Sequence, residues 1–117
     1  MRVKCDLEDY LEVETFDRTG ELVGTFDCYW TNGNEEAEFL GIKNSGDRVA
    51  VVPAKIADCD ERRSCILLNV SAARLEAAPT LDCDEEIGDE LAERVYDYFE
   101  LRKPEERSRL QIHRQTQ

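Results

Sequence analysis

The stretch from Glu21 to Pro53 constrains the fold most, because it alternates three runs of strand-forming residues with two turn clusters. It reads ELVGTFDCYWTNGNEEAEFLGIKNSGDRVAVVP. The turn clusters, Thr31–Asn34 and Asn44–Asp47, are short and contain glycine, as in turns that join neighbouring antiparallel strands. Pro53 ends the third run, because proline has no backbone N–H to donate to a sheet. The stretch therefore predicts three consecutive antiparallel strands.

The run from Glu21 to Thr31 has the clearest strand pattern in the chain, with side chains expected to alternate between two faces. One face is expected to carry Leu22, Gly24, Phe26, Cys28 and Trp30, and the other Val23, Thr25, Asp27 and Tyr29. Gly24 within this run indicates a bend or a close approach of another backbone. The next run, Ala37–Lys43, is expected to pair back against it.

Further strands are predicted on both sides of this stretch. Leu11–Phe16 alternates before a turn, Arg48–Val52 is rich in β-branched residues, and a last hairpin joins Lys55–Asp60 to Ser64–Val70. Six short strands at close spacing with tight turns predict a mainly β fold. The architecture expected is a small antiparallel β-barrel of about six strands.

Two helices are predicted after the strands. Ser71 is a good N-cap for a short helix over Ala72–Ala77, and a longer helix is predicted near Asp89–Arg102, before Pro104. The longer helix presents one apolar stripe, made by Ile87, Leu91, Val95, Tyr98 and Phe99. This stripe must be buried against the chain's own barrel or against a second copy, and the short connection favours the first alternative.

The length of 117 residues predicts one domain. Residues 1–10 are charged and are expected to be loose, and residues 11–103 form the predicted barrel domain with its C-terminal helices. Residues 104–117 form a polar tail that is expected to be disordered.

The strong negative charge excludes several classes of partner. A formal net charge of −12 argues against direct nucleic-acid binding, because phosphate recognition needs clustered Lys and Arg. The same charge disfavours docking on an anionic membrane. The sequence contains no run of about 20 apolar residues, and its first residues are charged rather than apolar. We therefore expect a cytoplasmic protein without membrane insertion.

The sequence contains no convincing catalytic or metal-binding constellation. Its one histidine, His113, lies in the predicted tail, so a base beside a nucleophilic Ser or Cys is not expected. The segment Asp82–Glu93 approaches a calcium-loop pattern, but Ile87 stands where that loop needs glycine. Its acidic residues are better explained by the start of a helix, where negative charge is favourable. We expect a protein that is not an enzyme and has neither cofactor nor metal.

The five cysteines are odd in number and scattered, with no C-x-x-C pair. In a reducing compartment such residues are mostly small buried apolar groups. One disulfide is conceivable, between Cys59 and Cys65, because these residues could face each other across the last hairpin.

Four motifs in order along the chain resemble the PRC-barrel family. They are GELVGTFD at Gly20–Asp27, FLGI at Phe39–Ile42, VAVVPA at Val49–Ala54 and VSAARLEAAP at Val70–Pro79. The resemblance covers roughly residues 11–101 and implies a small β-barrel that serves as an adaptor, as in a stand-alone bacterial PRC-barrel protein. Family members form the cytoplasmic part of the photosynthetic reaction-centre H subunit and the C-terminal half of a bacterial ribosome-maturation factor. We expect neither the membrane span of the former nor the preceding RNA-protein-binding domain of the latter, and no catalytic residue is carried over.

These observations predict a non-enzymatic protein-interaction or adaptor module whose partner is unknown. The alternative is an accessory factor in ribosome or RNA-particle assembly that binds a basic ribosomal protein, because an acidic surface suits a basic partner. A homodimer is also considered. The candidate interaction surface comprises Tyr29, Trp30, Glu85, Glu86, Asp89, Glu93, Tyr96 and Tyr98.

Overall fold

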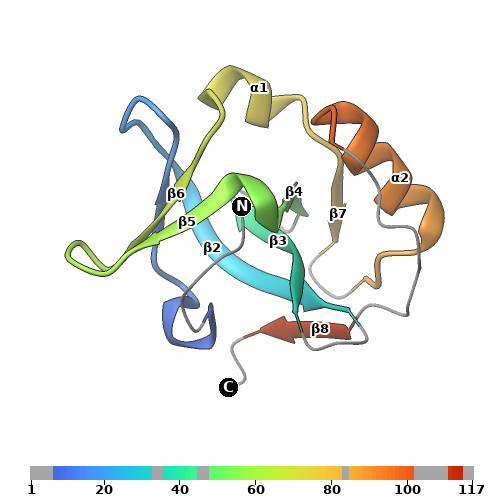
Figure 1. The fold of residues 1–117 in the computed structure, drawn as a ribbon, viewed down its shortest axis with the longest axis horizontal. Helices are drawn as coiled ribbons and strands as arrows, with labels where there is room; N and C mark the ends of the chain where they lie inside the picture. Colours follow the sequence, from blue (N-terminus) through green and yellow to red (C-terminus); the bar gives the residue numbers. More distant parts are fainter. Residues whose placement is uncertain (1–6, 33–35, 45–47, 83–84, 102–110, 115–117) are drawn as a thin grey trace.

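The computed structural model describes residues 7–32, 36–44, 48–82, 85–101 and 111–114. These residues form one sheet of eight strands and two α-helices (Figure 1). The strands are β1 (Glu14–Phe16), β2 (Leu22–Thr31), β3 (Ala37–Lys43), β4 (Arg48–Pro53), β5 (Ala57–Asp60), β6 (Cys65–Leu68), β7 (Thr80–Asp82) and β8 (Gln111–Arg114). The helices are α1 (Ala72–Glu76) and α2 (Asp89–Tyr98), with short 3-10 turns η1 (Leu7–Tyr10) and η2 (Ala54–Ile56). The predicted mainly β fold with a short and then a longer helix is confirmed.

The sheet differs from the predicted barrel in strand number and in pairing. Its strand order is β5-β6-β1-β2-β3-β4-β7, and β8 also pairs with β2. β1 and β6 run parallel, with Thr15 opposite Ile66, so the sheet is mixed rather than wholly antiparallel. In the described part of the chain, the end strands β5 and β7 do not pair with each other, so closure into a barrel is not confirmed. The number of strands is eight rather than about six, because β7 and β8 were not predicted.

The alternation predicted for β2 is broken in both halves of the strand. Before Gly24, Leu22 is 52% exposed and Val23 only 7%, which is the reverse of the predicted faces. After Gly24, a bulge between Phe26 and Cys28 puts Phe26 on the face of Tyr29, with their ring centres 6.0 Å apart, and not on the face of Cys28 and Trp30 as predicted. Gly24 lies between the two halves with a φ of +154°, a conformation that other residues rarely adopt. A Cβ at this position would lie 2.5 Å from the carbonyl oxygen of Lys43. Of the two predicted alternatives, a bend or a close backbone approach, the close approach is therefore confirmed.

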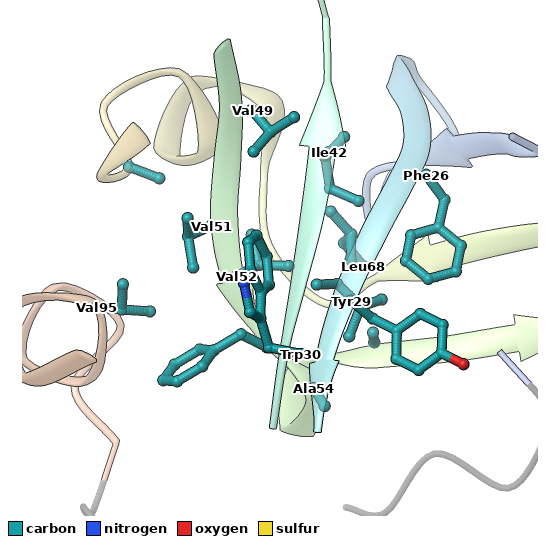
Figure 2. Close-up of a cluster of buried hydrophobic side chains, with 14 of the residues drawn as sticks. Phe26, Tyr29, Trp30, Ile42, Val49, Val51, Val52, Ala54, Leu68 and Val95 are labelled. Atoms are coloured by element: carbon teal, nitrogen blue, oxygen red, sulfur yellow. The ribbon is translucent and has the colours of Figure 1, made fainter. Parts of the chain in front are cut away.

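The core lies around β2, β3 and β4, and Figure 2 shows part of it. β3 is buried on both faces, since Phe39, Leu40 and Ile42 have at most 1% of their surface exposed. Gly41 lies between them because no larger residue fits: a Cβ there would lie 2.6 Å from the sulfur of Cys28. The middle of the sheet is thus packed on both sides.

Both helices begin where the sequence predicts, and the longer one packs on the chain's own sheet. The Ser71 hydroxyl accepts a hydrogen bond from the backbone N–H of Arg74 at 3.2 Å, as expected of an N-cap. The buried stripe of α2 comprises Ala92, Val95, Tyr96 and the following Phe99. Val95 faces β4 (Figure 2), and the ring of Tyr96 lies 5.2 Å from that of Phe39. Tyr96 therefore replaces the predicted Tyr98 as the buried aromatic residue, because i, i+3, i+4 and i+7 positions share one helix face.

Helix α2 ends at Tyr98 rather than at the predicted Arg102, which lies outside the described residues. Glu100 adopts a φ of +57°, and its N–H donates to the carbonyl of Asp97. The N–H of Leu101 donates to the carbonyl of Tyr96. This pair of bonds is the Schellman ending of a helix, in which the residue at the left-handed position is usually glycine. The sequence offers glutamate instead, which explains why the helix end was not predicted.

Two described segments lie in regions that were expected to be loose. η1 falls within residues 1–10, and its Leu7 is buried. β8 falls within the predicted tail 104–117 and pairs with β2. Within the described ranges, neither helix has the length and apolar character needed to cross a membrane.

Candidate interaction surface

Three of the four aromatic residues in the predicted surface belong to the core. Trp30 is fully buried, Tyr96 is 2% exposed and Tyr29 is 8% exposed. A partner cannot contact Trp30 or Tyr96 in this structure, so these residues stabilise the fold instead. Sequence reasoning placed them at the surface because an aromatic residue in a strand or helix can serve either purpose.

The fourth aromatic residue, Tyr98, links the two helices. Its hydroxyl donates a hydrogen bond to the carbonyl of Arg74, and the guanidinium of Arg74 donates back to the carbonyl of Tyr98. The same guanidinium lies 4.9 Å from the centre of the Tyr98 ring, in a cation–π arrangement. Tyr98 therefore fixes α1 against the end of α2.

The four predicted acidic residues are all exposed. Glu85 and Glu86 precede α2, and Asp89 and Glu93 lie on the helix one turn apart. On a helix of 3.6 residues per turn, Asp89 and Glu93 point away from the buried stripe, as do Glu90 and Asp97. We call the set Glu85, Glu86, Asp89, Glu90, Glu93 and Asp97 the acidic face. The structure thus brings together the acidic part of the predicted surface and separates it from the aromatic part.

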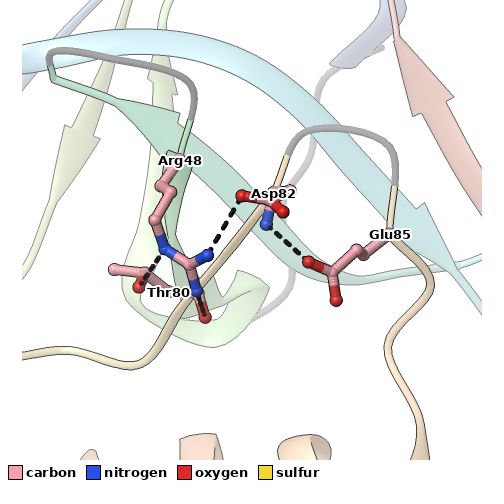
Figure 3. A network of polar contacts seen from close by, with 4 residues as sticks. All are labelled: Arg48, Thr80, Asp82 and Glu85. Atoms are coloured by element: carbon pink, nitrogen blue, oxygen red, sulfur yellow. Dashed lines mark hydrogen bonds and ion pairs between the residues drawn. The ribbon is translucent and has the colours of Figure 1, made fainter.

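A network of polar contacts beside the acidic face joins the edge strand β7 to β4 (Figure 3). The guanidinium of Arg48 donates to a carboxylate oxygen of Asp82 at 3.0 Å, and to the hydroxyl and carbonyl oxygens of Thr80 at 3.1 and 2.9 Å. The backbone N–H of Asp82 donates to the carboxylate of Glu85 at 3.2 Å. Two carboxylates of the calcium-like segment therefore have structural partners. Among the described residues, no group of three or more potential ligands lies close enough to hold a metal ion.

Asp17 is a buried carboxylate that connects two distant parts of the chain. One oxygen accepts hydrogen bonds from the hydroxyl and N–H of Thr19 and from the N–H of Glu21, at 2.7, 2.9 and 2.8 Å. The other accepts from the N–H of Ala72, at the start of α1, at 2.9 Å. The hydroxyl of Thr19, followed by the backbone donors, lowers the pKa of Asp17 to about 2. Asp17 is therefore charged at neutral pH and acts as a structural acceptor, and only its local turn was predictable.

His113 and the cysteines offer no catalytic pair that the structure describes. The imidazole stacks on the ring of Tyr29 at 4.8 Å, and its Nε2 lies 2.9 Å from the hydroxyl of Thr31. Cys28 and Cys65 are buried free thiols, and burial raises the pKa of Cys65. Cys59 is disulfide-bonded. The disulfide considered between Cys59 and Cys65 is not formed, because Cys65 is free and lies opposite Asp60 rather than Cys59.

No protein-family model matches the chain, and no curated protein matches it.

Proposed function

We propose that the protein is a non-enzymatic protein-interaction module of the PRC-barrel type, and that its partner presents a basic surface. The distribution of charge carries this proposal. Residues 1–101 contain ten Lys or Arg and 25 Asp or Glu, which gives a formal charge of −15. Residues 102–117 contain five Lys or Arg and two Glu, which gives a formal charge of +3. A folded body with so large a negative charge attracts basic partners over a distance and repels acidic ones.

The order of the four PRC-like motifs on the sheet supports the family part of the proposal. The first motif, Gly20–Asp27, spans the turn before β2 and most of that strand. Phe39–Ile42 lies in β3, Val49–Ala54 in β4, and Val70–Pro79 contains α1. The motifs thus occupy the central strands and the helix that follows them. On this proposal the curved eight-stranded sheet corresponds to the barrel of the family.

The acidic face is the surface that we propose for the partner. Its six carboxylates are exposed and lie on or just before one helix, which is itself anchored by Val95 and Tyr96 in the core. A rigid helix presents charges in a fixed geometry, so little conformational freedom is lost when a partner binds. Binding through such exposed charges is weakened by salt.

The alternative proposal is an accessory role in ribosome or RNA-particle assembly. The same negative charge favours it, because ribosomal proteins that contact RNA are basic. The two proposals differ in the identity of the partner rather than in the surface. Co-sedimentation with ribosomal particles at low salt, lost at raised salt, is expected for the alternative and not for a general adaptor.

The test is a pull-down from native cytosol at low salt, with bound proteins identified by mass spectrometry. The variant carries Glu85→Gln, Glu86→Gln, Asp89→Asn and Glu93→Gln, which remove four charges from the acidic face and keep the side-chain shapes. The matched control removes four exposed charges elsewhere, by Glu14→Gln, Asp58→Asn, Glu61→Gln and Glu76→Gln. We expect the partner to be lost from the first variant and retained by the control. If both variants retain the partner equally, the acidic face is not the binding surface. If both variants lose the partner equally, net charge alone explains binding.

A further inference from the structure

One edge of β2 is shared by two segments from opposite ends of the described chain. β3 pairs along one edge of β2, and the other edge is divided. β1 pairs with its first part, and the backbone bonds of Phe26 with Val13 and Glu12 extend that pairing. β8 pairs with its last part, Cys28–Thr31 (Figure 1). The second half of this edge is therefore completed by a strand that lies some eighty positions further along the sequence.

β8 is a short strand at this edge. It is four residues long and pairs, within the described residues, with β2 alone. Among its described side chains, His113 stacks on Tyr29 and forms a hydrogen bond with Thr31. Ile112, opposite Trp30, is its one apolar residue and is half-buried. So short and polar a strand is among the first elements to open locally.

The edge beneath β8 is suited to accept a strand. When β8 leaves, the backbone donors and acceptors of Cys28–Thr31 that face it lose their partners, and unpaired edges are templates for strand addition. The acceptor strand itself stays in place, because Cys28 and Trp30 are fully buried. The ring of Tyr29 provides a fixed stacking surface for an incoming side chain.

We propose that the Cys28–Thr31 edge is a strand-acceptor site, and that its occupant in trans is the β8 strand of a second copy of this chain. β8 is the strand whose register, stacking and side-chain hydrogen bond fit this edge in the structure. The charge of the exchanged segment suits this edge, because residues 102–117 carry +3 and residues 1–101 carry −15, whereas the net charge of −12 on each copy opposes their association. Exchange in both directions gives a two-fold symmetric dimer. This proposal is independent of the adaptor role, because it concerns a different surface.

The chain's own β8 competes with the β8 of a second copy for the Cys28–Thr31 edge. A linker of nine residues joins Leu101 to Gln111, which gives the cis strand an effective concentration on the order of millimolar. Exchange between intact chains is therefore expected to increase with protein concentration. Binding in trans is expected to be strongest when the chain cannot use its own β8.

The test uses the full chain with Ile112→Pro and His113→Pro. Successive N–H groups of a strand point to opposite edges, so two successive prolines remove at least one donor that faces β2. The control carries Thr116→Pro and Gln117→Pro, beyond β8. A fluorescent peptide of residues 108–117 replaces the second copy's strand, and its anisotropy measures binding. We expect the peptide to bind the Ile112/His113 variant with a Kd at least tenfold lower than its Kd for the control protein. A second peptide that carries His113→Ala is expected to bind the Ile112/His113 variant at least tenfold more weakly than the first peptide.

Equal affinity of the two proteins for the peptide overturns the acceptor site. If the peptides with and without His113→Ala bind equally well, the edge does not recognise the β8 sequence, because the net charge that both peptides share then explains binding. If the double-proline variant does not fold by circular dichroism, His113→Ala in the full chain takes its place, with the same expected order of affinities. Light scattering during size exclusion then tests the second copy: the wild-type dimer fraction is expected to rise with concentration and to be lost in the variant. A dimer that persists unchanged in the variant overturns the exchange.

Discussion

The middle of the sheet and its periphery are held by different kinds of interaction. In the middle, β2, β3 and β4 bury large apolar side chains completely, and each such side chain contributes on the order of 1.5–3 kcal/mol. At the periphery, β7 buries one side chain, Leu81, and is joined to β4 by an ion pair between Arg48 and Asp82, whose side chains are 54% and 58% exposed. An exposed ion pair contributes at most about 1 kcal/mol. We therefore expect the middle to contribute most of the global stability and the peripheral elements to contribute less.

Side chains in the middle of the sheet are buried and stabilise the fold, whereas exposed side chains at the periphery are available to a partner. Trp30 and Tyr96 belong to the middle, and substitutions there report on folding. The acidic face and β8 belong to the periphery, where substitutions can change binding while the core is preserved. The following predictions test whether the two regions respond so differently.

The largest effect is expected from Phe39→Ala, in the middle of β3. Phe39 is fully buried and packs against Tyr96 of α2, so its removal leaves a cavity between the sheet and the helix. We expect the free energy of unfolding to fall by about 4 kcal/mol, measured by urea denaturation. Leu22→Ala is the control, because Leu22 is 52% exposed, and a loss of less than about 0.5 kcal/mol is expected. Similar losses for both would remove the distinction between middle and periphery.

Adding one methyl group to the middle is expected to be nearly as damaging. In Gly41→Ala the new Cβ would lie 2.6 Å from the Cys28 sulfur and 3.2 Å from both Trp30 and Val49. We expect a loss of about 2–3 kcal/mol in the same assay, because the surrounding side chains cannot all move away. Gly88→Ala, at the start of α2, has no atom within 4 Å of the new Cβ and is expected to change stability by less than about 1 kcal/mol. Equal tolerance of the two substitutions would show that β3 is packed less tightly than described.

Asp17 joins the turn before β2 to the start of α1, and its effect is expected to depend on pH. Its pKa falls from an ordinary value of 3.8 to about 2 on folding, so the folded protein favours the charged form. The carboxylate therefore contributes stability that is fully present above pH 3.8 and is lost as the pH falls towards 2. We expect Asp17→Asn to lower the melting temperature at neutral pH and to flatten its decline over this acid range. An unchanged acid decline in the variant would assign acid sensitivity to other carboxylates.

The smallest effect is expected to be a gain, at the end of α2. Glu100 has a φ of +57°, which is strained for glutamate and easy for glycine. We expect Glu100→Gly to raise the free energy of unfolding by up to about 1 kcal/mol, reduced by the loss of a long, exposed ion pair with Arg74 at 3.7 Å. Glu100→Ala removes the same ion pair without relieving the backbone, so it should not stabilise the protein. A gain with alanine equal to that with glycine would mean that the charge, and not the backbone, is unfavourable.

The sequence predicted the middle of the sheet well because local patterns determine it. β3 has the predicted bounds, and β2 and β4 agree within one residue. Short turns and β-branched residues are properties of neighbouring positions, so they are visible without the fold. Ser71 as an N-cap and Gly24 as a close approach were predictable for the same reason.

The periphery was predicted poorly because distant contacts determine it. β8 has one apolar residue among four, and it forms a strand because β1 leaves half an edge of β2 unpaired. The parallel pairing of β1 with β6 and the hydrogen bond from Ala72 to Asp17 also join positions far apart in sequence. Among the candidate surface residues, charge predicted exposure correctly for the four acids, whereas aromatic character could not distinguish the buried Trp30 from the half-buried Tyr98.

The position of β8 in the sequence also orders events during synthesis. Thr31 and His113 lie 82 positions apart, so their contact cannot form until the other strands that the structure describes have been made. At 5–20 residues per second, residues 102–117 follow the rest of the body by roughly one to three seconds. Until β8 pairs with β2, the Cys28–Thr31 edge is open. On the proposed exchange, the nearest copies that could supply a strand at that stage are chains made on the same messenger RNA.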